Sequence, residues 1–158
     1  MDKLPITKAG EVKISAQLHQ LKTKDRVEIS QAIADARAHG DLKENAEYHA
    51  AKEQQGLAEA RIREIESKLS RSQVIDVLSI PSSGKVIFGT TIKLFNISEG
   101  IDVSYKIVGE DEADVQTGKI SFSSPLARAL IAKEEGDLIK FESPSGVQEY
   151  EILSVSHK

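Results

Sequence analysis

The sequence predicts an α+β protein in two parts: an N-terminal antiparallel α-helical coiled-coil hairpin, then a domain with a mostly antiparallel sheet and one helix. Two observations predict this. From residue 8 to about residue 74, apolar side chains recur at three- and four-residue steps, which is typical of amphipathic helices. From about Gln73 onward, short runs rich in β-branched and aromatic residues alternate with turns that contain Gly, Pro and Ser. The change of pattern predicts a hairpin at residues 1–75 and a globular domain at residues 76–158.

Two long helices account for the first part. Thr7, which follows Pro5, is a suitable N-cap for the first helix, and Gly40 interrupts the helical pattern between the two. Each helix should span roughly 27–32 residues, or about 40–48 Å at 1.5 Å per residue. Asp25 and Glu28 fall near core positions, so the seam is expected to be imperfect. The predicted seam residues are Ile14, Leu18, Leu21, Ile29, Ile33 and Ala36 on the first helix, and Ala46, Ala50, Leu57, Ile62, Ile65 and Leu69 on the second.

Six strands and one helix are expected in the second part. Ser124 followed by Pro125 reads as an N-cap and first helical residue, so the single helix should begin there. The expected strands are Val74–Val77, Val86–Phe95, Val103–Val108, Ile120–Phe122, Leu138–Phe141 and Tyr150–Val155.

Composition excludes several classes of protein. The 158-residue chain has no cysteine, so it holds neither a disulfide framework nor a thiolate metal site. No apolar run approaches the roughly 20 residues that a membrane helix needs, and the N-terminus lacks the apolar stretch of a signal peptide, so we expect a cytoplasmic protein without a membrane partner. The net charge of −4 divides into about +1 for residues 1–75 and about −5 for residues 76–158, which argues against sequence-independent coating of DNA.

Two carboxylates, Asp41 and Glu44, stand at the expected turn between the helices. Their spacing resembles a capping box, in which Asp41 caps the second helix and Glu44 is its third residue. Mg²⁺ typically takes only one or two carboxylates plus waters and phosphate oxygens, so the same pair is also suited to half of a metal site that a partner completes. The spacing alone leaves both interpretations open, and they are compatible.

The whole chain resembles one known family. The run GDLKENAEYHAAKEQQ at Gly40–Gln55, the segment VIDV after the second helix and the segment SPLARALIAKEEGD closely resemble the bacterial transcript cleavage factors of the Gre family, A-type. The resemblance implies an FKBP-like fold for residues 76–158. It also implies that the protein is an accessory factor rather than an enzyme. Such a factor rescues backtracked RNA polymerase by inserting its coiled coil into the secondary channel and stimulating the polymerase's own Mg²⁺-dependent cleavage of the nascent RNA 3′ end.

The resemblance also implies roles for individual residues. Asp41 and Glu44 are the catalytic acids, which hold Mg²⁺ transiently and jointly with the polymerase active site. Arg37 and Lys52 correspond to a basic patch that contacts the extruded RNA. At the position of Lys52, an arginine is common in the family. The lysine keeps the positive charge but cannot form the two parallel hydrogen bonds of a guanidinium group. The turn Ser123–Pro125, made of Ser123, Ser124 and Pro125, is a candidate contact with the polymerase rim.

Other residues near the tip receive structural interpretations. Tyr48 can stack on a base, but packing across the hairpin is the favoured interpretation. Asn45 and Glu47 are expected to cap or orient rather than to bind a metal. His39 and His49 flank the tip without a third nitrogen or sulfur ligand, which argues against zinc.

Two other functions compete with transcript cleavage. One is a non-catalytic coiled-coil binder or inhibitor of RNA polymerase, which needs neither Asp41 nor Glu44. The other is a peptidyl-prolyl isomerase, which the FKBP-like fold alone suggests. Such an enzyme needs an aromatic-lined pocket, whereas this chain has no Trp and its aromatic residues are mostly spaced as sheet core.

Overall fold

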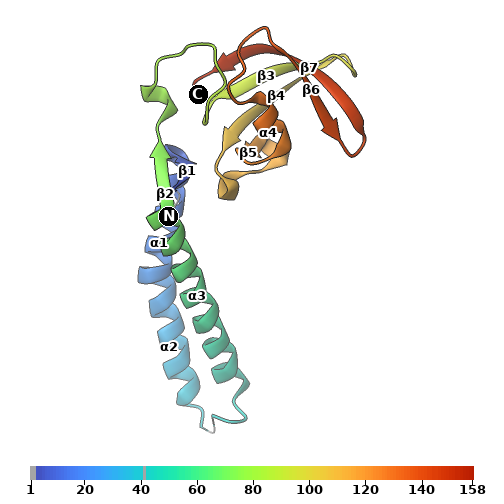
Figure 1. Ribbon diagram of the computed structural model, residues 1–158. Helices are drawn as coiled ribbons and strands as arrows, with labels where there is room; N and C mark the ends of the chain where they lie inside the picture. The colour runs from blue at the N-terminus through green and yellow to red at the C-terminus, as the bar shows by residue number, and fades with distance from the viewer. Residues whose placement is uncertain (1–2, 41) are drawn as a thin grey trace. The chain divides into compact units, whose positions relative to one another are not determined.

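The computed structural model describes residues 3–40 and 42–158 and divides into two compact units. The first, residues 11–72, is a helical hairpin (Figure 1). The second consists of residues 73–158 together with the N-terminal segment up to Gly10. The change between the units therefore falls at Ser72/Gln73, close to the boundary expected from the sequence pattern, while the first residues of the chain pack with the second unit.

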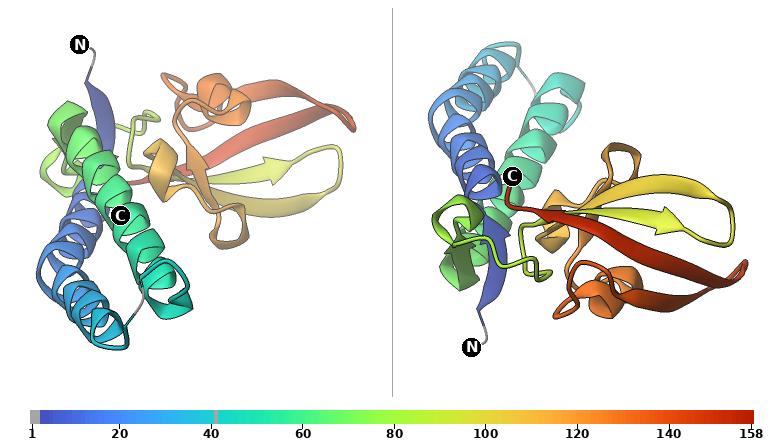
Figure 2. Two further views of the ribbon diagram at one scale, coloured as in Figure 1. Left: turned by 90° about the horizontal axis from the view of Figure 1, so that it is seen from below. Right: turned by 90° about the horizontal axis from the view of Figure 1, so that it is seen from above.

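Two antiparallel helical arms build the hairpin (Figures 1 and 2). The first arm runs without interruption through α1 (Lys8–Gln20), a π-helical turn η1 (Leu21–Asp25) and α2 (Arg26–Arg37). The second arm is a single helix, α3 (Ala46–Arg71). The first arm is about 45 Å long and the second about 39 Å at 1.5 Å per residue. The predicted hairpin is therefore confirmed, and the second helix, with 26 residues, is slightly shorter than expected.

The seam of α3 follows a regular heptad pattern that differs in part from the predicted one. Seven buried or half-buried residues recur at alternating steps of three and four, and the half-buried Glu59, Arg61 and Lys68 lie beside them. The seven are Tyr48, Ala51, Gln55, Ala58, Ile62, Ile65 and Leu69. Ala46 and Ala50 are exposed, and the side chain of Leu57 is 66% exposed. The prediction was wrong at these three positions, because α3 begins only at Ala46 and its inward face is set by Ile62 and Ile65.

The π-helical turn η1 explains the irregular seam of the first arm. Ile14, Leu21, Ile29 and Ala36 are buried or half-buried, at steps of seven, eight and seven residues. The eight-residue step spans η1, because a π turn holds one residue more than an α turn. Glu28, which a strict seven-residue repeat would place in the seam, is exposed as a result.

Ion pairs connect the two arms beside the seam. The guanidinium of Arg26 donates two hydrogen bonds to the carboxylate of Glu59, at 3.0 and 2.7 Å. This pairing lowers the pKa of Glu59 and raises the pKa of Arg26, chiefly through the hydrogen bonds themselves. Lys22 pairs with Glu66 at 3.2 Å. These contacts favour one alignment of the first arm along the second.

The second unit contains a five-stranded sheet with strand order β5-β4-β3-β7-β6. All neighbouring strands are antiparallel except β4 and β5, which are parallel, so the mostly antiparallel α+β fold is confirmed. The strands are β3 (Thr91–Asn96), β4 (Ile101–Val108), β5 (Lys119–Ser121), β6 (Leu138–Ser143) and β7 (Gly146–Ser156). A separate two-stranded sheet joins β1 (Leu4–Thr7) and β2 (Ser72–Ile75), and short 3₁₀ turns lie at η2 (Val77–Ser79), η3 (Glu110–Glu112) and η4 (Val115–Thr117).

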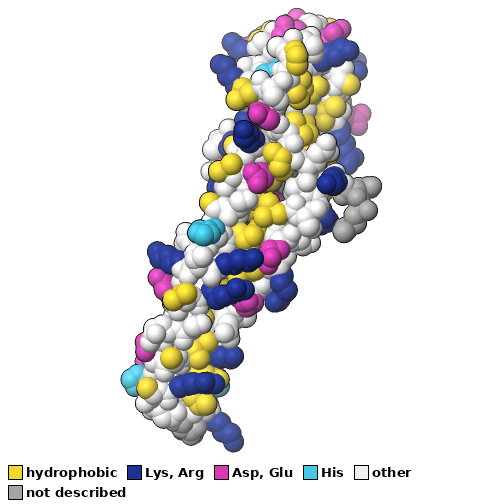
Figure 3. Space-filling view, turned by 90° about the vertical axis from the view of Figure 1, so that its left-hand side faces the viewer, with side chains coloured by type: hydrophobic (Ala, Val, Ile, Leu, Met, Phe, Trp, Pro, Cys, Tyr) yellow, Lys and Arg dark blue, Asp and Glu magenta, His cyan; other side chains and the backbone are white. Residues whose placement is uncertain are grey.

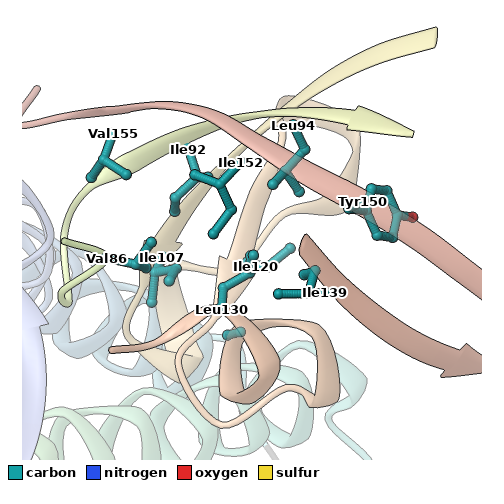
Figure 4. Packing of buried hydrophobic residues seen from close by; sticks show 11 residues of the cluster. Val86, Ile92, Leu94, Ile107, Ile120, Leu130, Ile139, Tyr150, Ile152 and Val155 are labelled. Carbon is teal, nitrogen blue, oxygen red and sulfur yellow. The ribbon is translucent and has the colours of Figure 1, made fainter. Parts of the chain in front are cut away.

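The hydrophobic core lies between the sheet and helix α4 (Pro125–Leu130), as Figure 4 shows. Ile92, Leu94 and Ile107 from the central strands and Leu130 from α4 are completely buried. The partly buried residues packed around this cluster are Phe88, Val103, Tyr105, Phe122, Leu126 and Phe141. Most of the aromatic residues thus serve the core, as their spacing predicts.

One predicted strand is shorter than expected. The run Val86–Phe95 was predicted as a single strand, but β3 begins only at Thr91. Gly89 has a φ of +88°, which turns the chain before the sheet starts. Val86 instead exchanges backbone hydrogen bonds with the segment after α4, through Ala132 and Lys133.

The N-terminal segment is held to the second unit by Glu112. The carboxylate of Glu112 accepts hydrogen bonds from the backbone N–H and the hydroxyl of Thr7, and from the backbone N–H of Gly109. The same Thr7 hydroxyl oxygen accepts from the N–H of Gly10, so Thr7 caps the first helix as predicted. The start of α1 is therefore fastened to the loop that follows β4.

Candidate functional site at the hairpin tip

The tip loop runs from Ala38 to Asn45 between α2 and α3. Helix α2 ends at Arg37, and Gly40, with a φ of +112° that costs little only for glycine, turns the chain away from the helical path three residues later. Asp41, the first of the two predicted acids, lies outside the described residues. The described part of the loop has no regular secondary structure up to Asn45.

Asn45, rather than Asp41, caps helix α3. The Asn45 side-chain oxygen accepts a hydrogen bond from the N–H of Tyr48 at 3.0 Å. Since α3 begins at Ala46, Glu44 precedes the cap and is not the third residue of the helix. The capping-box interpretation of Asp41 and Glu44 was therefore wrong, and the expected capping role of Asn45 is confirmed.

Glu44 has an exposed side chain and lines an open hollow. The other residues around this hollow are His39, Asn45, Ala46 and Glu47. The nearest ion pair at the tip joins His39 to Glu47 at 3.9 Å and leaves Glu44 out. Glu44 thus presents its carboxylate to solvent at the far end of the hairpin.

The described part of the tip offers the exposed carboxylate of Glu44, an oxygen donor of the kind that Mg²⁺ takes. Within residues 3–40 and 42–158, no group of three or more His, Cys, Asp or Glu side chains could hold a metal. Mg²⁺ retains most of its waters and commonly takes one or two carboxylates together with phosphate oxygens. Glu44 suits such an ion only where a partner provides the remaining ligands.

A basic and aromatic cluster lies on the hairpin beside the tip. The guanidinium carbon of Arg37 lies 5.9 Å from the centre of the Tyr48 ring, so these two residues face each other across the hairpin. Tyr48 is half-buried, which favours the interpretation that it packs across the hairpin. Lys52, one helical turn further along α3, is exposed and donates to Gln55 at 3.0 Å. Figure 3 shows lysine and arginine side chains along one face of the hairpin, including its lower end.

The predicted docking residues form the turn between β5 and α4. Ser124 caps α4 by accepting from the N–H of Ala127 at 3.2 Å, and Pro125 is the first helical residue. The Ser123 hydroxyl donates to a carboxylate oxygen of Glu110 at 3.1 Å. The turn is held by these hydrogen bonds and belongs to the second unit, whereas Arg37, Glu44 and Lys52 belong to the first.

The sequence does not predict a second hydrogen bond of the Asn45 side chain at the tip. The side-chain amide nitrogen of Asn45 donates to the carbonyl of Ala36 at 2.6 Å, across the two arms. The sequence contains a signal for the cap, since Asn is a preferred N-cap residue before a helical run. It contains no signal for the second bond, because that bond depends on how α2 approaches the start of α3.

Both halves of the chain match family models. The model described as Transcription elongation factor, N-terminal, matches residues 4–74, and the model described as Transcription elongation factor, GreA/GreB, C-term, matches residues 81–157. Relatives named Transcription elongation factor GreA occur in Thioalkalivibrio sulfidiphilus and Pseudomonas aeruginosa. They are 55% and 58% identical over 157 residues, which is 99% of this chain and 99% of each relative.

A solved structure also matches the chain along most of its length. The crystal structure of GreA factor homolog 1 from Thermus thermophilus is 28% identical, covers 97% of this chain and 98% of its own, and gives a TM-score of 0.43. The family assignment rests on the sequence matches rather than on that superposition.

Hairpin, sheet domain and sequence matches together define a transcription elongation factor. More specifically, the chain belongs to the GreA/GreB family. Among the described residues, no helix is long and apolar enough to cross a membrane.

Proposed function

We propose that this protein stimulates RNA polymerase to cleave the 3′ end of its own nascent RNA, and so rescues backtracked complexes in the cytoplasm. The observation that carries the proposal is the exposed carboxylate of Glu44 at the end of a hairpin about 40 Å long. A rod of this length carries an acid about 40 Å from the base of the hairpin, which is the reach that insertion into the secondary channel requires.

The acids act as part of a site that belongs to the polymerase. Phosphodiester cleavage can use two metal ions, one to activate water and one to stabilise the leaving oxygen. Glu44 and Asp41 supply carboxylates, and the polymerase and its RNA supply the other ligands of a shared Mg²⁺. The protein is therefore an accessory factor to the polymerase active site.

Arg37 and Lys52 contact the extruded RNA in this proposal. Phosphates are contacted mainly by Arg and Lys, and both cations are exposed near the tip. The Arg37→Ala, Lys52→Ala double variant should weaken crosslinking to the RNA 3′ end while leaving polymerase binding intact. The Arg63→Ala variant changes another exposed cation on α3 and is the control.

A cleavage assay on stalled, backtracked complexes tests the function. Wild-type protein with Mg²⁺ should release 3′ RNA fragments, whereas the Glu44→Gln and Asp41→Asn variants should not. The Glu53→Gln variant removes an exposed acid elsewhere on α3 and should remain fully active. If Glu44→Gln and Asp41→Asn cleave like wild type, the acids have no catalytic role. If wild-type protein itself releases no fragments, the protein is a non-catalytic binder.

Binding measured in the same complexes separates docking from cleavage. We propose that the turn Ser123–Pro125 docks on the rim of the secondary channel, because it presents a rigid, capped edge of the second unit. The Ser123→Arg variant should lose polymerase binding, whereas Glu44→Gln should keep it. Equal binding by Ser123→Arg and wild type would contradict the docking assignment.

A further inference from the structure

Asn45 makes two hydrogen bonds that together join the ends of the two arms at the tip. Its side-chain oxygen accepts from the N–H of Tyr48 at 3.0 Å, inside α3. Its side-chain nitrogen donates to the carbonyl of Ala36 at 2.6 Å, in the last turn of α2. One half-buried side chain therefore closes the tip loop at its base.

The amide group of asparagine is chemically necessary for this double contact. Ser, Asp and Asn are all good N-caps, so capping by itself does not require asparagine. An aspartate carboxylate has no hydrogen to donate, and a serine side chain is shorter by one heavy-atom bond. Only the planar amide offers an acceptor and a donor that point in different directions at this distance from the backbone.

The acceptor of the second bond is a carbonyl at a helix end. The last carbonyls of a helix lack partners within the helix, and that of Ala36 receives the N–H of His39 at 3.2 Å and the Asn45 amide. The side chains of Ala36 and Ala51 are only 2% and 5% exposed, so the arms approach closely here. The tether thus lies beside buried side chains of both arms, directly behind the loop.

Glu44 is the residue immediately before the tether. Consecutive Cα atoms are about 3.8 Å apart, so fixing Asn45 to both arms also confines the backbone of Glu44. We propose that Asn45 is a positioning residue, whose tether between α3 and α2 holds the Glu44 carboxylate where a shared Mg²⁺ can use it. This inference rests on the proposed function and adds a residue to it.

The test compares Asn45→Ser with wild type in the cleavage assay across a range of Mg²⁺ concentrations. Serine keeps the cap but loses the tether, so helix content and polymerase binding should remain at wild-type levels. Cleavage at limiting Mg²⁺ should fall by about 10- to 100-fold, since a shift on the order of 1 Å in a reacting group costs about that much. Raising the Mg²⁺ concentration should recover part of the rate. The Ser30→Ala variant, which changes an exposed polar residue on α2, is the control.

The possible outcomes distinguish a failure of the positioning role of Asn45 from a failure of the proposed function. If Asn45→Ser cleaves like wild type at every Mg²⁺ concentration, the positioning role is refuted. If it loses helix content or polymerase binding in proportion to cleavage, the role is only structural and the proposal is also refuted. If wild-type protein does not stimulate cleavage at all, the proposed function fails instead.

Nuclear magnetic resonance tests the tether without polymerase. The side-chain amide hydrogens of Asn45 should exchange slowly with solvent and show contacts to Ala36. Exchange at the rate of a free side-chain amide would refute the tether, whatever the outcome of the cleavage assay.

Discussion

The π-helical turn η1 makes a sharp prediction about a single-residue deletion. Lys24 is exposed and lies inside η1, which holds the one extra residue of the first arm. Deleting Lys24 should convert the π turn into an ordinary α turn. Ile14 and Leu21 on one side, and Ile29 and Ala36 on the other, would then follow an unbroken seven-residue repeat.

A deletion in α3 gives the matched comparison. Ala60 is also exposed, but α3 has no π turn to absorb the loss. Removing one residue rotates the two halves of α3 by about 100° relative to each other, since an α-helix has 3.6 residues per turn. If Ile62 and Ile65 stay in the seam, Ala51 and Tyr48 must leave it.

Burial gives the size of the difference. A half-buried tyrosine covers on the order of 100 Å² and an alanine methyl is worth about 0.8 kcal/mol, so deletion of Ala60 should cost about 3 kcal/mol. Deletion of Lys24 should change the free energy of unfolding by less than about 1 kcal/mol. For a unit of this size, 1 kcal/mol corresponds to roughly 4–8 °C in melting temperature.

Circular dichroism at 222 nm measures the outcome, because most helical residues belong to the hairpin. The Ala60 deletion should lower the melting temperature several times more than the Lys24 deletion. Equal losses of melting temperature in the two variants would show that η1 does not accommodate one extra residue of the first arm. A neutral Ala60 deletion would refute the heptad seam of α3.

Two further predictions concern burial and pH. Leu94→Ala removes a completely buried side chain and should cost about 2–5 kcal/mol in the second unit. Leu57→Ala, the same change at a 66% exposed position, should be almost neutral, and calorimetry of both variants checks this contrast. Arg26 lowers the pKa of Glu59 in the folded state. The ion pair therefore stabilises the hairpin fully above about pH 4.3, the ordinary pKa of a Glu side chain. This stabilisation is lost as the pH falls through the lowered pKa of Glu59. Thermal melts between pH 6 and pH 3 should show a smaller acid-induced loss for Glu59→Gln than for wild type; identical losses would contradict the pairing.

Periodicity and turn chemistry were enough to predict most of the architecture. The three- and four-residue apolar steps predicted both arms, and Thr7, Ser124 and Pro125 act at helix starts as expected. These signals are local, because a cap or an amphipathic face depends on residues within a few positions of one another. The placement of Leu57 in the seam failed for a related reason: one residue along a helix is enough to turn a side chain from the seam to solvent.

The chemical groups at the tip can be read from the sequence: an acid at Glu44, cations at Arg37 and Lys52, and a glycine in the turn between the helices. The way these groups are held depends on how the two arms pack. Asn45 is both cap and tether because α2 ends beside the start of α3, and the π turn η1 is tolerated because it keeps Ile29 and Ala36 in the seam. The Asn45–Ala36 bond and the place of η1 in the seam both depend on the packing of one arm against the other, which no local pattern encodes.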